Sequence, residues 1–160
     1  RTYIRDQFVN LIKTKYPQVE LIAGVATGAI AQGALVAQEL GLPFVYVRSA
    51  AKNHGLENLI EGEYKEGQKV VVVEDLISTG GSSLQAVEAL RNAGCDVLGM
   101  VAIFTYGFQK AIDNFTNAHC VLDTLSDYNA MIDLAQKTGY VQESDVAKLK
   151  EWRLSPESYK

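Results

Sequence analysis

Short apolar runs alternate along the chain with segments whose apolar residues recur at helical spacing. The run at 70–73 consists of four valines without polar alternation, which is typical of a parallel strand buried on both faces. In the segment 2–16, Ile4, Phe8 and Leu11 form one helical face that stops before Pro17. The pattern predicts strands at 21–25, 44–47, 70–73, 97–104 and 120–122, and helices at 2–16, from 30 to near 41, 84–94, 109–115 and 127–137.

This alternation predicts an α/β fold, a doubly wound parallel sheet flanked by helices with right-handed crossovers. We expect residues 1–160 to form one domain, with a helix and tail at 143–160 whose role the pattern does not indicate. Ligands of such sheets bind outside the carboxyl ends of the strands. The loops 24–29, 48–67 and 74–83 are therefore expected to meet at one site.

The segment 70–83 carries the most specific chemistry, because it joins the valine run to Glu74, Asp75 and a turn of hydroxyl residues and glycines. We expect the strand to end where the carboxylates begin, the turn to span 78–83, and the helix to start at Leu84. Glycines let a backbone approach a phosphate, and N–H groups at a helix start attract an anion. Four hydroxyl groups, those of Ser78, Thr79, Ser82 and Ser83, add donors.

The acidic pair would repel a bare phosphate, so it is expected to accept hydrogen bonds from sugar hydroxyls or to hold a hydrated Mg²⁺. The segment thus predicts a sugar-phosphate site. A Walker A loop needs a lysine before its Ser or Thr, and none lies between Glu74 and Arg91. The Gly-x-Gly-x-x-Gly pattern of dinucleotide sites is also missing around Gly80 and Gly81.

Composition narrows the class of partner. A net charge of −4 without a basic block argues against a broad nucleic-acid surface. Cys95 and Cys120 have no CxxC or Cys/His spacing partner, which favours free thiols in a reducing compartment. No apolar stretch has the length of a membrane span and no signal segment opens the chain, so we expect a cytoplasmic protein. His119 and Cys120 are adjacent on an expected strand and would point to opposite faces, which disfavours a shared metal.

The segment 70–83 resembles the motif with which type I phosphoribosyltransferases bind 5-phosphoribosyl diphosphate (PRPP). Further similarity, to the orotate-specific branch of that family, extends from about residue 1 to about residue 140. It is carried by 74–82 together with Arg48, Lys52-Asn53-His54-Gly55 and Phe104-Thr105-Tyr106-Gly107.

This resemblance implies transfer of a phosphoribosyl group from PRPP to orotate, with Mg²⁺ held mainly through PRPP rather than by a protein metal site. It implies catalytic roles for Lys52, His54 and Asp75 and a diphosphate loop at Ala26, Thr27 and Gly28. The residues implied to bind PRPP and orotate are Arg48, Lys52, His54, Glu74, Asp75, Leu76, Ile77, Ser78, Thr79, Gly80, Gly81 and Ser82. It further implies a homodimer whose 48–67 loop acts across the interface. The length of this loop and its glycines independently favour a mobile lid.

The chain departs from the family pattern at several positions. Ser49, Ala50 and Ala51 follow Arg48 where relatives often carry a further lysine, and Gly28 replaces a basic residue of some diphosphate loops. The chain begins with Arg1, and we expect that an N-terminal segment contributing to the orotate-binding hood precedes it in the full protein. Two alternatives stay open: a phosphoribosyltransferase for a purine or another pyrimidine, and a PRPP-sensing regulatory domain without turnover.

Overall fold

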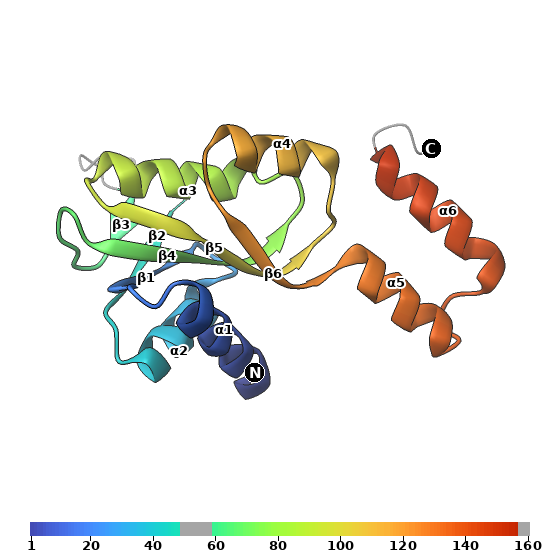
Figure 1. The fold of residues 1–160 in the computed structure, drawn as a ribbon, viewed down its shortest axis with the longest axis horizontal. Helices are drawn as coiled ribbons and strands as arrows, with labels where there is room; N and C mark the ends of the chain where they lie inside the picture. The colour runs from blue at the N-terminus through green and yellow to red at the C-terminus, as the bar shows by residue number, and fades with distance from the viewer. Residues whose placement is uncertain (49–58, 157–160) are drawn as a thin grey trace.

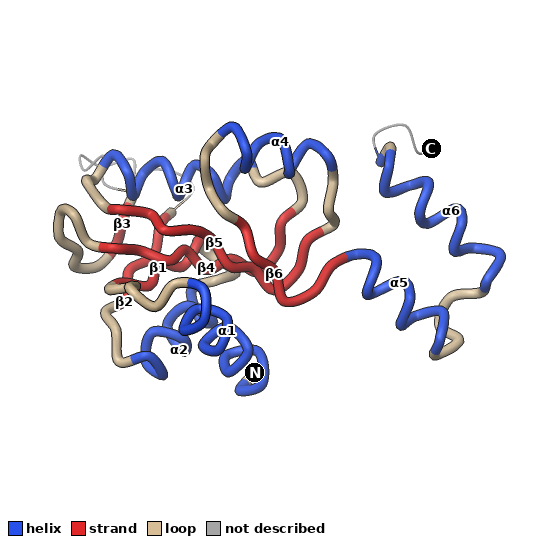
Figure 2. Tube along the Cα trace, in the orientation of Figure 1, coloured by secondary structure: helices blue, strands red, loops and turns tan. Residues whose placement is uncertain are grey.

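A computed structural model describes residues 1–48 and 59–156 of the chain. Within them, the sheet has the strand order β3-β2-β1-β4-β5-β6 (Figures 1 and 2). All neighbouring strands pair in parallel except β2 and β3, which are antiparallel. The elements are α1 (Thr2–Lys15), β1 (Leu21–Val25), α2 (Ile30–Leu40), β2 (Phe44–Val47), β3 (Ile60–Glu61), β4 (Lys69–Ile77), α3 (Gly81–Asn92), β5 (Asp96–Thr105), α4 (Gln109–Asn117), β6 (Leu122–Asp127), α5 (Tyr128–Lys137) and α6 (Glu143–Leu154).

Helices cover both faces of the sheet, with α1 and α2 on one side and α3 and α4 on the other (Figure 1). Each face of the sheet has its own apolar core, and alternate residues of β4 belong to each. Val70 and Val72 pack on the side of α3 and α4, while Val71 and Val73 pack on the side of α1 and α2. Burial of each such side chain stabilises the fold by about 1.5–3 kcal/mol. The predicted α/β fold with a doubly wound, mainly parallel sheet is thus confirmed.

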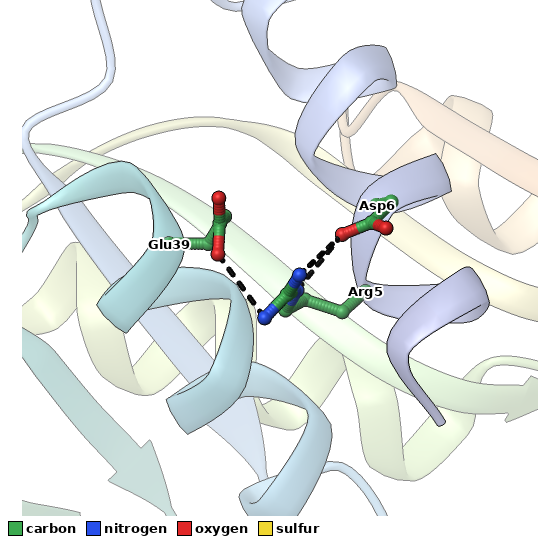
Figure 3. Close-up of polar contacts among 3 residues, drawn as sticks. All are labelled: Arg5, Asp6 and Glu39. Atoms are coloured by element: carbon green, nitrogen blue, oxygen red, sulfur yellow. Dashed lines mark hydrogen bonds and ion pairs between the residues drawn. The ribbon is translucent and has the colours of Figure 1, made fainter.

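Charged residues join the two helices on the first face (Figure 3). Arg5 of α1 lies 3.1 Å from the Glu39 carboxylate of α2 and 2.7 Å from that of its neighbour Asp6. Both pairs are partly exposed, so solvent screens the attraction between the charges and each pair adds little to stability. The apolar contacts of Phe8 and Ile12, both fully buried, therefore dominate the attachment of α1.

Three predicted boundaries are wrong in an informative way. Strand β4 continues through Glu74 and Asp75 to Ile77, because β5 pairs with it along that whole length. Helix α3 begins at Gly81 rather than at Leu84, since Gly80 adopts the left-handed conformation that ends the turn. The last strand lies at Leu122–Asp127 instead of 120–122; it is a half-buried edge strand whose polar residues hid it from a search for apolar runs.

The predicted 48–67 loop also contains the short strand β3, which pairs with the end of β2. Residues 49–58 lie outside the described residues, and so does the lid predicted there. Beyond β6, helices α5 and α6 form an antiparallel pair that extends away from the sheet (Figure 1). None of the helices in 1–48 and 59–156 is long and apolar enough to cross a lipid bilayer.

Candidate active site

The acidic pair lies at the carboxyl end of the central strand β4, where its two members have different surroundings. Successive strand residues face opposite sides of a sheet, so Glu74 is only 5% exposed whereas Asp75 is open to solvent. Glu74 accepts a 2.7 Å hydrogen bond from the Ser83 hydroxyl and a 3.0 Å bond from the Asp75 N–H. Burial raises the pKa of Glu74 to about 7, against the lowering effect of these two donors. The two carboxylates are therefore chemically distinct.

The Ser83 hydroxyl does not serve as the phosphate donor that the sequence predicted. Ser83 is 3% exposed and its hydroxyl is directed to Glu74. Because α3 begins at Gly81, this serine lies in the first turn of the helix and faces the sheet. Ser78 and Ser82 are exposed and Thr79 is half-buried, so these three residues remain candidates for hydroxyl donors to a ligand.

The predicted diphosphate loop lies directly against the acidic pair. A Cβ atom built on Gly28 would overlap Asp75 Oδ2, so a larger residue at this position requires the Asp75 carboxylate to move. The Ala26 N–H donates to the Val47 carbonyl over 2.8 Å, which ties the loop to the end of β2. Thr27 and Gly28 are exposed, and the Ala26–Thr27 peptide bond is cis. The loops after β1 and β4 therefore meet, as their positions in the sheet predicted.

The turn after β4 presents backbone N–H groups at the start of α3. Its first helical hydrogen bond runs from the Leu84 N–H to the Gly80 carbonyl over 2.9 Å. The N–H groups of Gly81, Ser82 and Ser83 precede that bond, and such groups have no partner within a helix. Together with the helix dipole they suit a phosphate.

Two neighbouring residues of α4 support this turn, and neither is predicted as a site residue from the sequence. Asn114 Nδ2 donates to the Thr79 carbonyl over 2.8 Å. The Phe115 ring lies under Gly80, since a Cβ there would be 2.5 Å from its Cε2 atom. Gly80 has φ of 80°, which other residues rarely adopt. Their separation in sequence from the turn, and their ordinary helical spacing, hid both residues.

The cationic residues expected at the site are only partly described. Arg48 follows β2 and forms an ion pair with Glu61 of β3, with 3.3 Å between Nη1 and Oε1. Lys52 and His54 lie outside the described residues. Arg48 would therefore have to exchange Glu61 for a substrate phosphate, which the sequence did not predict.

Leu76 and Ile77, which complete the predicted binding segment, differ in exposure. Leu76 is 43% exposed, whereas Ile77 is fully buried and can offer only its backbone. The Ile77 carbonyl accepts a hydrogen bond from the Tyr106 N–H over 3.1 Å, so the chain after β5 runs beside the turn at 78–83. The predicted segment Phe104–Gly107 therefore borders the site.

An aromatic cluster that the sequence pattern does not indicate surrounds Tyr106. Tyr106 stacks on Phe108 with 5.2 Å between ring centroids, and Trp152 of α6 meets both rings edge-on. A pocket of about 460 Å³ adjoins the cluster between α4, β6 and α6, with Asp127 and Arg153 among its polar side chains. The cluster attaches α6 to the end of β5.

Within 1–48 and 59–156, no three His, Cys, Asp or Glu side chains are grouped to hold a metal ion. His119 and Cys120 lie in the turn before β6 rather than on the strand predicted there. The sulfur of Cys120 contacts the Val121 carbonyl, and Cys95 and Cys120 are both buried free thiols.

Comparison with known proteins places this geometry in a family. A model of the phosphoribosyl transferase domain matches residues 4–134. The orotate phosphoribosyltransferase of Bacteroides thetaiotaomicron is 60% identical over 156 residues, which cover 98% of this chain and 74% of that protein. The enzyme of the same name from Porphyromonas gingivalis is 60% identical over 159 residues, covering 99% of this chain and 76% of the relative.

Solved structures agree in fold. The orotate phosphoribosyltransferase of Aeropyrum pernix matches with a TM-score of 0.76 at 26% identity, over 88% of this chain and 76% of that one. The adenine phosphoribosyltransferase of Leishmania tarentolae has the same fold, with a TM-score of 0.65 at 24% identity over 81% and 71% of the two chains. The fold is thus shared by enzymes named for different bases, whereas the high sequence identity is to the orotate enzymes. The chain belongs to the phosphoribosyltransferase family and, within it, to the orotate phosphoribosyltransferases.

Proposed function

We propose that this protein transfers the 5-phosphoribosyl group from PRPP to a ring nitrogen of orotate, giving orotidine 5′-monophosphate and diphosphate, a step of pyrimidine biosynthesis. The observation that carries the residue roles is the contact between the two loops. The Gly28 backbone lies against the Asp75 carboxylate, and Asp75 lies five residues before the Gly80 turn. A ligand with a phosphate, a hydroxylated sugar and a diphosphate, in that order, matches this arrangement.

The turn at 78–83, called the phosphate turn below, is proposed to hold the 5-phosphate of PRPP. Its donors are the hydroxyls of Ser78, Thr79 and Ser82 and the N–H groups of Gly80 and Gly81. Glu74 and Asp75 then accept hydrogen bonds from the ribose 2- and 3-hydroxyls. Leu76 and Ile77 contribute mainly through their position between these two groups.

The diphosphate is proposed to leave along the loop of Ala26, Thr27 and Gly28, received by Arg48, Lys52 and His54. Bond breaking at C1 places positive charge on the ribose and negative charge on the leaving diphosphate, and fixed charges that match both lower the barrier. Mg²⁺ is proposed to enter with PRPP, bound to its phosphate oxygens as a hard cation prefers. Asp75 faces the developing positive charge, and no covalent nucleophile is required.

The test of this function is chromatographic detection of nucleotide and diphosphate after incubation with PRPP and Mg²⁺. Orotate, uracil, adenine, guanine and hypoxanthine are supplied separately. Product with orotate alone supports the proposal. Product with another base would replace the substrate but keep the PRPP site, and PRPP binding without any product would favour a regulatory domain.

The shared site is a separate part of the proposal. We propose a homodimer in which Lys52 and His54 serve the neighbouring subunit. Lys52→Ala and Asp75→Asn should each reduce turnover by about 10²-fold, the scale seen when one preorganised charge contact is lost. Mixing the two inactive proteins should restore activity through hybrid dimers that contain one intact site. Absence of recovery after verified subunit exchange would contradict a shared site.

The buried free thiols Cys95 and Cys120 support the expected reducing, cytoplasmic setting.

A further inference from the structure

Helix α4 touches the phosphate turn through consecutive residues that have no part in the family motif. Asn114 donates from Nδ2 to the Thr79 carbonyl over 2.8 Å, and Phe115 packs beneath Gly80. We propose that Asn114 is a positioning residue that sets the direction of the Thr79–Gly80 peptide and so prepares the turn for a phosphate.

The geometry of a trans peptide carries this inference. In a planar trans peptide the C=O and the following N–H point in opposite directions, and the Thr79–Gly80 bond is trans. Since the Thr79 carbonyl points to Asn114 on α4, the Gly80 N–H points away from α4. It thereby joins the N–H groups of Gly81 and Ser82, which have no partner within α3.

The backbone at Gly80 does not by itself determine the orientation of the Thr79–Gly80 peptide. Gly80 has no side chain, and glycine occupies both halves of the φ range with similar ease. A rotated Thr79–Gly80 peptide would turn the carbonyl oxygen toward the bound phosphate and replace an attraction with a repulsion. The Asn114 hydrogen bond holds one orientation, whereas the Phe115 ring limits the space beneath Gly80 without choosing between the two.

This inference rests on the proposed function, because the anion in question is the 5-phosphate of PRPP. It is tested by equilibrium binding without turnover, using two probes that report on the two ends of the substrate site. Ribose 5-phosphate probes the turn after β4, and Mg²⁺-diphosphate probes the loop at 26–28. Calorimetric titration gives a dissociation constant for each.

Asn114→Ala should weaken ribose 5-phosphate binding by roughly fivefold to tenfold, the effect of one lost hydrogen bond. Asn114→Asp keeps the shape of the side chain but presents a carboxylate to the Thr79 carbonyl, and it should weaken binding more. Asn114→His retains a ring N–H donor and should recover part of the affinity. Diphosphate binding should change less than about twofold in all three.

Asn117→Asp is the matched control, because it adds the same charge to an exposed position of α4. It should leave both dissociation constants near the wild-type values, and a thermal melt checks that each variant is folded. Equal weakening of both probes would show a general structural role and overturn the inference, as would unchanged ribose 5-phosphate binding in Asn114→Ala and Asn114→Asp. If the wild-type protein forms no product with orotate, the proposed function is refuted. The inference about Asn114 can still be tested, because both dissociation constants are measured without turnover.

Discussion

Replacing Glu74 by glutamine should stabilise the fold and, at the same time, impair the enzyme. Glu74 is 5% exposed, and burial is the largest cause that raises its pKa to about 7 from an ordinary 4.5. Glutamine has nearly the same shape and carries no charge. Its oxygen can accept the Asp75 N–H, and its amide can donate to the Ser83 hydroxyl in place of the present bond.

The expected size of the effect follows from the two pKa values. The folded state binds the proton more tightly than the unfolded state, so the carboxyl lowers the free energy of unfolding as pH rises from about 4.5 to about 7. A pKa difference of that size means that the carboxyl lowers the free energy of unfolding by about 3 kcal/mol at pH 8 and by about 1 kcal/mol at pH 5. The glutamine variant removes this loss. Its advantage over the wild type should therefore grow by about 2 kcal/mol between the two pH values.

Urea unfolding at pH 5 and pH 8, without PRPP or Mg²⁺, measures this advantage. Glu88→Gln is the control, because Glu88 is an exposed carboxylate on α3, and its stability should stay within about 0.5 kcal/mol of wild type at both pH values. Turnover of Glu74→Gln with PRPP and orotate should fall by about 10²-fold. An advantage that is the same at pH 5 and pH 8 would refute the account of Glu74 as a desolvated carboxylate.

Three further changes test the backbone of the site. Gly28→Ala should displace the Asp75 carboxylate and lower kcat/KM by about 10²-fold with an unchanged circular dichroism spectrum, and normal activity would mean that this close approach is not needed for catalysis. Gly80→Ala should lower the free energy of unfolding by about 1–3 kcal/mol in urea titrations, because its φ of 80° and the Phe115 ring both oppose a side chain; a stability equal to wild type would contradict this. Chelation of Mg²⁺ should abolish product formation, which excess Mg²⁺ restores, and turnover that persists in the chelator would exclude the Mg²⁺–PRPP complex as the substrate.

The fold was predictable because its signals are local. The valine run of β4 and the helical spacing in α1 each mark an element without reference to the rest of the chain. The boundaries at Glu74 and Leu84 were wrong because pairing with β5 and the left-handed Gly80 decide them. Strand β6 was misplaced for a related reason, since a polar edge strand is recognised only by its partner.

The residues of the candidate site differ in the same way: some have a local sequence signal, and others are recognised only through contacts with distant residues. The acidic pair and the glycine turn were found from the sequence because they are contiguous and chemically unusual. Asn114 and Phe115 were not found, since their contacts bridge about 35 residues of chain. The sequence also treated Ser83 as a phosphate donor, because only the helix start at Gly81 shows that its hydroxyl faces Glu74.

The different surroundings of Glu74 and Asp75 have a consequence for the proposed reaction. A buried carboxyl with a pKa of about 7 is only partly ionised near neutral pH in the free protein. A positive charge that develops on the ribose beside it favours the ionised form. In the proposed reaction, the interaction between Glu74 and the sugar therefore strengthens as the C1–O bond breaks. It stabilises the transition state more than bound PRPP, and only such a difference accelerates the chemical step. Asp75, which is exposed beside the loop at 26–28, is proposed to face the same developing charge from the solvent side of the site.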